Sequence, residues 1–322
     1  MDFFCLQKFI KKLPVKYFSF TSIGKSVQNR KIYAVLTKNN SKKWVIITAG
    51  IHAREHLSCD FLCKIIKKYA KMMAEKCRIV SKLPGVTTKS DNILPFNIAF
   101  IPMLNPDGIE LCLHGTKGLA EQEKQRLISI NKSADFSLWK ANFNGVDLNN
   151  NFPANWHKKF TKNFAPAPQG FYGEKPLSEP ESKALYLFTK KLSPFLTLSY
   201  HLKGEEIYYD FFQKGHQKRR DFAIAKIFAK ATGYKIKSTQ KFSSGGYKDW
   251  CVQSLKIPAL TIELGDDNFA HPYPKNQLPK MVKKNIAIFD CLMSSYMVYN
   301  RCEEKYGNKI HEKGSSPCGT SV

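Results

Sequence analysis

The sequence lacks an apolar run long enough for a membrane-spanning helix. Its best candidate, residues 93–104, contains Asn97 and two prolines, whereas a span takes roughly 18 or more apolar residues. The start of the chain also lacks the pattern of a secretory signal. Its apolar segment, residues 3–6, is short and is followed by lysines instead of being preceded by them. We therefore expect no membrane span and no export by that route.

Cysteine is present, but not at the spacings that mark disulfide frameworks or metal sites. The nine cysteines are an odd number, with no CxxC pair and no cluster with histidine at metal spacing. Such isolated thiols are typical of a reducing compartment, so we expect a cytoplasmic protein. Cys59 and Cys63 fall among apolar residues at helical spacing, and we interpret them as small core residues without a catalytic role.

Acidic residues are scarce beside basic ones. The chain of 322 residues has 51 Lys+Arg against 26 Asp+Glu, a formal net charge of +25, yet 43% of it is hydrophobic and 13% aromatic. This apolar content excludes a disordered polyelectrolyte and is enough for the core of one or two domains. The lysines are spread along the chain, and no segment resembles a nucleic-acid-binding module. We expect a solvated basic surface that attracts anionic substrates and polymers, without a specific nucleic-acid site.

Apolar periodicity alternates between that of strands and that of helices, with no internal repeat. After a polar N-terminal stretch and a hairpin through residues 32–36, the pattern predicts strands at 44–49, 96–103, 195–200, 206–211 and 258–264. It predicts helices at 57–73, 179–192, 218–231 and 277–299. This order predicts a single α/β domain, residues 1–302, with a central mixed twisted sheet and helices on both faces. We interpret residues 303–322 as a polar tail and a candidate for disorder.

Three features lie where open α/β sheets place their active sites, at the carboxyl ends of strands. His52 and Glu55 follow the strand at 44–49, so both can face one ion, although a surface ion pair is the commoner explanation of such a pair. His201 follows another strand, where a hydrogen-bonded core histidine is commoner. Glu263 is a carboxylate inside an apolar strand, and because burying an unpaired carboxylate is costly, it needs a partner or a function.

Two imidazoles and a carboxylate leave a fourth tetrahedral position for water on zinc, the arrangement known from carboxypeptidase A. With these residues and the segments 105–108 (Asn-Pro-Asp-Gly) and 145–149 (Gly-Val-Asp-Leu-Asn), the chain resembles the zinc carboxypeptidase family over nearly its whole length. The resemblance implies the fold of that family. It also implies one Zn²⁺ per chain, held by His52, Glu55 and His201.

The same resemblance implies roles for residues around the ion. Glu263 would be the general base and then the general acid. Asp147 would accept the free ring N–H of His52 and so fix its tautomer. Lys140 lies where the family usually has an arginine that stabilises the oxyanion. A lysine supplies the positive charge but not the paired N–H donors of a guanidinium group. The alternative interpretation is that Lys140 is an ordinary surface lysine without this role.

The chain departs from the family pattern in its substrate-binding residues. Typical members bind the terminal carboxylate of the substrate with an Asn-Arg pair, and this sequence has Asn149 and Asn150 instead. An ordinary carboxypeptidase acting on L-peptides is thereby disfavoured, but it stays the nearest alternative. Tyr247 and Lys248 match the segment on the floor of the specificity pocket, where a cation favours a substrate side chain that carries a carboxylate.

The segments 136–142, 201–208 and 245–250 look like one branch of the family, the bacterial gamma-D-glutamyl-meso-diaminopimelate peptidases. That branch cuts the stem peptide of peptidoglycan, so the resemblance implies a peptidoglycan-derived peptide as substrate. In this interpretation, the lysines Lys203 and Lys248 would bind the carboxylates of the substrate. Glu205 or Glu206 would bind its amine. Ordinary solvated loop charges explain the loop residues equally well.

The rival from another class is a non-catalytic binder of anionic polymer or nucleic acid that uses the fold as a basic scaffold. A pure binder has no physical reason to keep three zinc ligands together with Glu263. Zinc content per chain separates these two hypotheses. The sequence does not define the oligomeric state.

Overall fold

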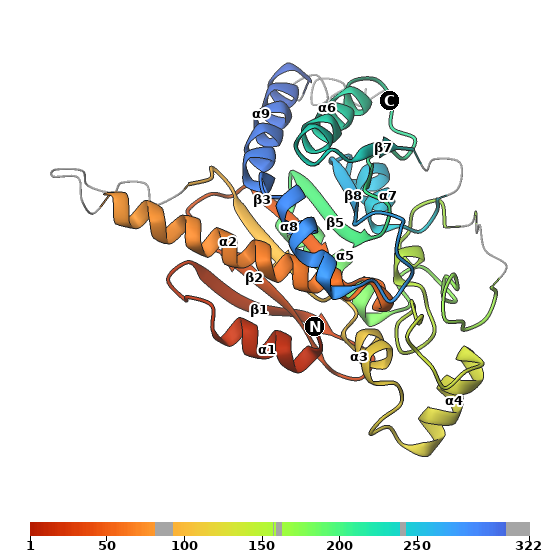
Figure 1. The fold of residues 1–322 in the computed structure, drawn as a ribbon. Helices are drawn as coiled ribbons and strands as arrows, with labels where there is room; N and C mark the ends of the chain where they lie inside the picture. Colours follow the sequence, from red (N-terminus) through yellow and green to blue (C-terminus); the bar gives the residue numbers. More distant parts are fainter. Residues whose placement is uncertain (81–92, 157, 159–162, 239–242, 307–322) are drawn as a thin grey trace, which may run out of the picture.

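A mixed sheet of eight strands forms the centre of the fold (Figure 1). The computed structural model describes residues 1–80, 93–156, 158, 163–238 and 243–306. The sheet order is β1-β2-β4-β3-β5-β8-β6-β7. The strand bounds are β1 (Phe18–Lys25), β2 (Lys31–Thr37), β3 (Trp44–Ala49), β4 (Asn97–Ile101), β5 (Leu196–Leu202), β6 (Glu206–Tyr208), β7 (Lys235–Lys237) and β8 (Ala259–Leu264).

The central strands β4, β3, β5 and β8 run parallel to one another. β1 and β2 pair antiparallel with their neighbours, and β6 pairs antiparallel with β8 and parallel with β7. β4 and β5 are buried at every position, and β3 and β8 at all but one. Such near-continuous apolar runs are typical of strands with a helix layer on each face. Because these strands are parallel, their carboxyl ends meet at one edge of the sheet.

Helices cover both faces of the sheet, as predicted. Their bounds are α1 (Phe3–Lys11), α2 (Leu57–Val80), α3 (Pro106–His114), α4 (Glu121–Asn131), α5 (Pro180–Leu192), α6 (Gly215–Thr232), α7 (Tyr247–Trp250), α8 (Leu278–Lys284) and α9 (Ile288–Tyr306). None of the helices in the described ranges has the length and apolar character to cross a bilayer.

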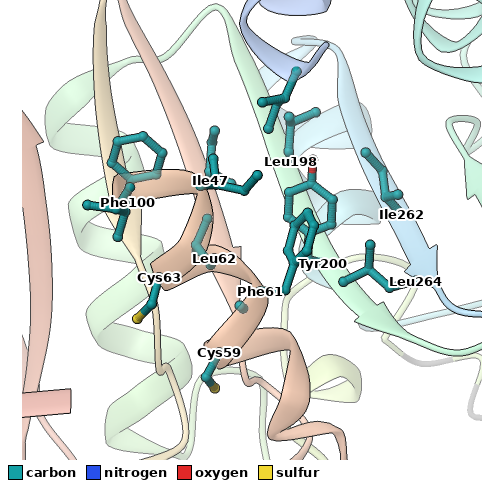
Figure 2. Close-up of a cluster of buried hydrophobic side chains, with 14 of the residues drawn as sticks. Ile47, Cys59, Phe61, Leu62, Cys63, Phe100, Leu198, Tyr200, Ile262 and Leu264 are labelled. Atoms are coloured by element: carbon teal, nitrogen blue, oxygen red, sulfur yellow. The ribbon is translucent and has the colours of Figure 1, made fainter. Parts of the chain in front are cut away.

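Two apolar cores lie on opposite sides of the sheet, because alternate residues of a strand point to opposite faces. Along β3, Val45 and Ile47 belong to the larger core and Ile46 to the smaller one. Figure 2 shows the larger core, where side chains of α2 pack against β3, β4, β5 and β8. Cys59 and Cys63 lie in this core, as predicted for small apolar residues.

The α/β class and the mixed sheet are confirmed, but several elements differ from their prediction. The N-terminal stretch, predicted as polar, forms α1, which buries Leu6 and Ile10. The predicted closing helix is two helices, α8 and α9, that are separated at Asn285. The Asn285 side chain donates to Tyr234 Oη and to the carbonyl of Met281. α9 continues to Tyr306, past the predicted start of the tail, and residues 307–322 lie outside the described part of the chain.

The segment at 105–108 starts a helix and ties two loops together. The Asn105 side chain accepts from Gly108 N and caps α3, and Pro106 occupies the first turn. Asn105 Nδ2 also donates to the carbonyls of Ile51 at 3.2 Å and Ala141 at 3.0 Å. One buried amide therefore joins the loop after β3 to a distant loop, and both loops contribute to the site described below.

Glu181 in the first turn of α5 is a fully buried acid away from that site. Its two oxygens accept from Val27 N at 3.1 Å and from Asn142 Nδ2 at 3.2 Å. Burial raises the pKa of Glu181 to about 8, and nearby Asp107 adds to the rise against the effect of these hydrogen bonds. The folded protein therefore binds a proton that the unfolded chain releases near pH 4.5.

A pKa raised by folding contributes stability that is present at low pH and is lost as the pH rises through the folded pKa. We expect the Glu181 contribution to the free energy of unfolding to decrease between about pH 5 and pH 8, by up to about 1.4 kcal/mol per pH unit. In Glu181→Gln we expect this part of the pH dependence of the free energy of unfolding to disappear, even if the substitution also changes the overall stability. Urea unfolding at four pH values measures the slope. The exposed-site control Glu75→Gln keeps the original slope, and equal slopes in both variants would contradict the assignment.

Candidate metal centre

Three buried side chains converge at the carboxyl edge of the sheet. His52 Nδ1 lies 2.8 Å from Glu55 Oε1. His201 Nδ1 lies 3.2 Å from Glu55 Oε2 and 3.2 Å from His52 Nδ1. Among the described residues, these form the one group of three or more potential metal ligands.

The topology explains how residues so far apart in the chain meet. β3 and β5 pair in parallel with Ala49 opposite Tyr200, so the loop after β3, which carries His52, lies beside His201 near the end of β5. A 3-10 turn, Ala53–Glu55, then brings Glu55 back toward His52. The backbone N–H of Leu202 donates to Glu55 Oε2 at 3.2 Å and holds this carboxylate against β5.

The donor set fits a single Zn²⁺. Zinc bonds of about 2.0–2.2 Å in tetrahedral geometry separate ligand atoms by about 3.3–3.6 Å, and the ligand atoms here lie 2.8–3.2 Å apart. Two imidazole nitrogens and one carboxylate oxygen are also ligand types that zinc prefers. Burial raises the pKa of Glu55, but His52 and His201 outweigh this effect and hold it well below its usual range. Glu55 is therefore an ionised, acceptor-only ligand.

Asp147 lies behind His52. Its Oδ1 is 3.3 Å from His52 Nε2, and its Oδ2 accepts from Gly170 N at 3.1 Å and pairs with Lys140 Nζ at 3.0 Å. Burial raises the pKa of Asp147, but Lys140 and His52 together lower it far below its usual value. Asp147 thus stays ionised between two basic groups, the position that its predicted role requires.

Lys140 belongs to the wall of a cavity, with 22% of its side chain exposed. Burial lowers the pKa of Lys140, but the carboxylates of Asp147 and Glu55 outweigh burial and raise it. The lysine therefore keeps its charge inside the site. Its backbone carbonyl accepts from Ala53 N at 3.1 Å, which ties this loop to the turn that carries the ligands.

Glu263 lies on β8 directly opposite His201 of β5. Its Oε2 is buried and has no hydrogen-bond partner among the described residues. Burial raises the pKa of Glu263 to about 8, although His201 and Lys140 act in the opposite direction. A carboxyl group beside the metal ligands with a pKa near neutrality can both take and return a proton.

These residues surround a cavity of about 270 Å³. Beyond the ligands, its lining contains two ammonium groups and two carboxylates, together with small and hydroxylated side chains. The lining residues are His52, Lys140, Asn149, His201, Tyr208, Ser243, Gly246, Lys248, Asp249, Thr261 and Glu263. The structure therefore brings His52, His201, Glu263 and Lys140 to one cavity, and Glu55 contacts both histidines beside it.

Lys248 and Asp249 form an ion pair in the cavity wall. Lys248 Nζ lies 2.5 Å from Asp249 Oδ1 and 2.8 Å from the carbonyl of Asp210, and Asp249 Oδ2 accepts from the Ser243 hydroxyl. Both charged side chains are almost completely buried. The cation predicted for the pocket floor is thus present, but its charge is balanced by a carboxylate that sequence reasoning did not assign to the site.

Sequence reasoning also missed Tyr208 and Thr261, which lie opposite each other on β6 and β8. Thr261 could have been found, because it precedes Glu263 by two positions and so shares its face of the strand.

Five predicted substrate-binding residues do not line this cavity. Lys203 pairs with Asp267 at 3.1 Å, and Glu205 pairs with Lys284 at 2.6 Å. Glu206 pairs with Lys237 at 3.4 Å, and the Tyr247 hydroxyl lies 2.8 Å from the Thr189 hydroxyl. Asn150 is the fifth residue outside the cavity lining. Of the predicted substrate-binding set, Asn149 and Lys248 reach the cavity.

Comparisons with known proteins agree with this geometry. A family model described as zinc carboxypeptidase matches residues 6–288. The chain is 31% identical over 293 residues to gamma-D-glutamyl-L-diamino acid endopeptidase 1 of Lysinibacillus sphaericus, covering 89% of this chain and 71% of the relative. It is 25% identical to carboxypeptidase O of Bos taurus, covering 86% and 73%. The structure of bovine thrombin-activatable fibrinolysis inhibitor superposes with a TM-score of 0.66 at 18% identity, covering 94% and 96%.

We expect the purified chain to contain about one zinc ion and His201→Ala to lose it on dialysis, because two of three ligands do not make a closed zinc site. Chelator should lower the melting temperature of the wild type and leave that of His201→Ala unchanged. Elemental analysis and thermal unfolding measure both effects. His114→Ala, at a half-exposed histidine on α3, is the matched control and retains its zinc. Equal zinc content in the two variants would exclude this metal centre.

Proposed function

The chain belongs to the zinc carboxypeptidase family and is a metallopeptidase, and we propose that it hydrolyses the gamma-D-glutamyl-meso-diaminopimelate bond of peptidoglycan stem peptides. The observation that carries this proposal is the buried Lys248–Asp249 pair in the wall of the cavity that also contains Glu263. Support comes from the relative at 31% identity, whose name describes action at a gamma-D-glutamyl-diamino acid linkage.

The charged wall suits a zwitterionic group. The far end of meso-diaminopimelate carries an ammonium and a carboxylate, which can meet Asp249 and Lys248 respectively. Both partners are already desolvated and paired, so a substrate with two complementary charges exchanges one set of ion pairs for another. A substrate with one charge leaves a buried partner uncompensated, which is costly.

Asp249 takes the amine-binding role that the sequence suggested for Glu205 or Glu206. Those two carboxylates already pair with Lys284 and Lys237. Asp249 lines the cavity, and within the described ranges its ion-pair partner is the buried Lys248. Asn149 also lines the cavity and offers an amide, without the arginine that ordinary carboxypeptidases use for a terminal carboxylate.

The proposed chemistry assigns one task to each residue. When bound, zinc supplies a Lewis acid toward water and the scissile carbonyl group. Glu263 takes one proton from the attacking water, whose oxygen bonds to the glutamyl carbonyl carbon. Lys140 stabilises the negative charge that develops on the carbonyl oxygen. The C–N bond then breaks, and Glu263 returns its proton to the departing diaminopimelate nitrogen.

Replacing the base should separate chemistry from metal binding. We expect Glu263→Gln to lower kcat by a factor on the order of 10² to 10⁴, since an amide cannot carry the proton, while zinc content stays unchanged. Product formation from a defined stem peptide, followed by mass spectrometry, measures the rate. The matched control is Glu206→Gln on the adjacent strand, where we expect less than about a tenfold change. Near-normal turnover by Glu263→Gln would remove this residue from the mechanism.

A substrate series tests the zwitterion specificity. We expect kcat/KM to be at least about tenfold higher for gamma-D-Glu-meso-diaminopimelate than for its lysine analogue, which lacks the carboxylate, or its 2-aminopimelate analogue, which lacks the ammonium. Equal rates for all three would contradict the role of the Lys248–Asp249 pair. Faster cleavage of an L-peptide with a free C-terminus would favour the ordinary carboxypeptidase instead.

A further inference from the structure

Helices α1 and α2 contact each other, and both carry exposed lysines. Their contact includes Lys67 Nζ over the Phe9 ring at 5.6 Å and the N-terminal ammonium paired with Asp60 at 2.7 Å. We define the cationic face as the exposed lysines of α1, its C-cap and α2. These are Lys8, Lys11, Lys12, Lys64, Lys67 and Lys71.

The cationic face has little neutralising charge. Within the described ranges, Lys71 is its one member with a carboxylate within 4 Å, Glu75 at 3.7 Å, and both of these side chains are largely exposed. Asp60, the nearest acid along the same stretch of α2, is occupied by the N-terminal ammonium. The lysines therefore project a positive potential that no local ion pair cancels.

Acidic residues are buried more often than lysines and arginines, which makes the protein surface more positive. In the described part of the chain, Lys248 is the one buried lysine and Arg220 the one buried arginine. Many acids are buried instead: Glu55, Asp107, Asp147, Glu179, Glu181, Asp210, Asp221 and Asp249. The outer surface is consequently enriched in cations beyond the ratio of 51 to 26 in the composition.

Apolar side chains stand among these lysines. Phe4 on α1 is 62% exposed, and Lys8 Nζ lies 4.1 Å from its ring centroid. Val15, just after α1, is 69% exposed. Spacings of three or four residues separate Phe4, Lys8, Lys11 and Val15. Within α1, the Phe4 ring therefore lies on the same helix face as Lys8 and Lys11. A soluble polyanion offers no apolar layer to such side chains, whereas a bilayer interface offers both anionic headgroups and an apolar layer.

We propose that the cationic face docks the protein on an anionic lipid surface. The lysines contact the headgroups, and Phe4 and Val15 enter the boundary between headgroups and acyl chains. α1 remains packed through Leu6 and Ile10, so docking needs no unfolding of the helix. This inference does not depend on the proposed substrate.

Co-sedimentation with phosphatidylglycerol–phosphatidylcholine vesicles tests the proposal. We expect binding to these vesicles, no binding to pure phosphatidylcholine, and loss of binding in high salt. Lys8→Gln/Lys11→Gln/Lys67→Gln should weaken binding on the order of 100-fold, since each lysine near an anionic bilayer contributes about a fivefold factor. Phe4→Ser should weaken binding by a factor that salt does not change.

The matched control removes three lysines from α5, which packs against the core on the other side of the sheet. Lys183→Gln/Lys190→Gln/Lys191→Gln lowers the net charge equally, and we expect its vesicle affinity to stay within about threefold of the wild type. Thermal unfolding confirms that every variant is folded. Equal losses of vesicle affinity in the two triple variants would overturn the proposal. It would also be overturned if the protein bound soluble polyglutamate more tightly than the vesicles and Phe4→Ser had no effect.

Discussion

The parallel register of β3, β5 and β8 is the constraint on which the site depends. It places the ends of three strands side by side, so that two imidazoles, one ligand carboxylate and Glu263 meet although they come from three separate parts of the chain. Neither the cavity nor its charges would exist if one of these strands shifted by a residue, because each side chain would then point to the other face of the sheet.

Burial of charge is the second theme of the structure. Glu55, Asp147 and Asp249 are each buried beside at least one basic group. Glu263 and Glu181 differ, because burial outweighs their neighbours and raises the pKa of both. Burial thus raises the pKa of both carboxyl groups, but the two groups have different surroundings. Glu181 is held by hydrogen bonds within the fold, whereas Glu263 faces the cavity with an oxygen that has no partner in the described ranges.

The sequence could predict the central strands, the longer helices α2, α5 and α6, and the side chains that meet at the edge of the sheet, because apolar periodicity and strand ends define them. It did not predict α1, α4 or the short strand β7. It could not predict the partners of charged residues in loops. Glu205 follows the ligand His201 closely, yet its carboxylate pairs with Lys284, a residue far along the chain. Asp249 is adjacent to Lys248 in the sequence, but its place in the cavity depends on how α7 packs against the sheet. Long-range packing of this kind leaves no local pattern.

Asn105 has a consequence for how the cleft can move. Its single amide group bonds to the loop of the ligand turn and to the loop of Lys140 at the same time. The ligand turn is further fastened to Lys140 through Ala53 N. Neither of these two loops can shift relative to the other without breaking buried hydrogen bonds, so we expect the zinc ligands and Lys140 to keep their mutual positions when a substrate enters.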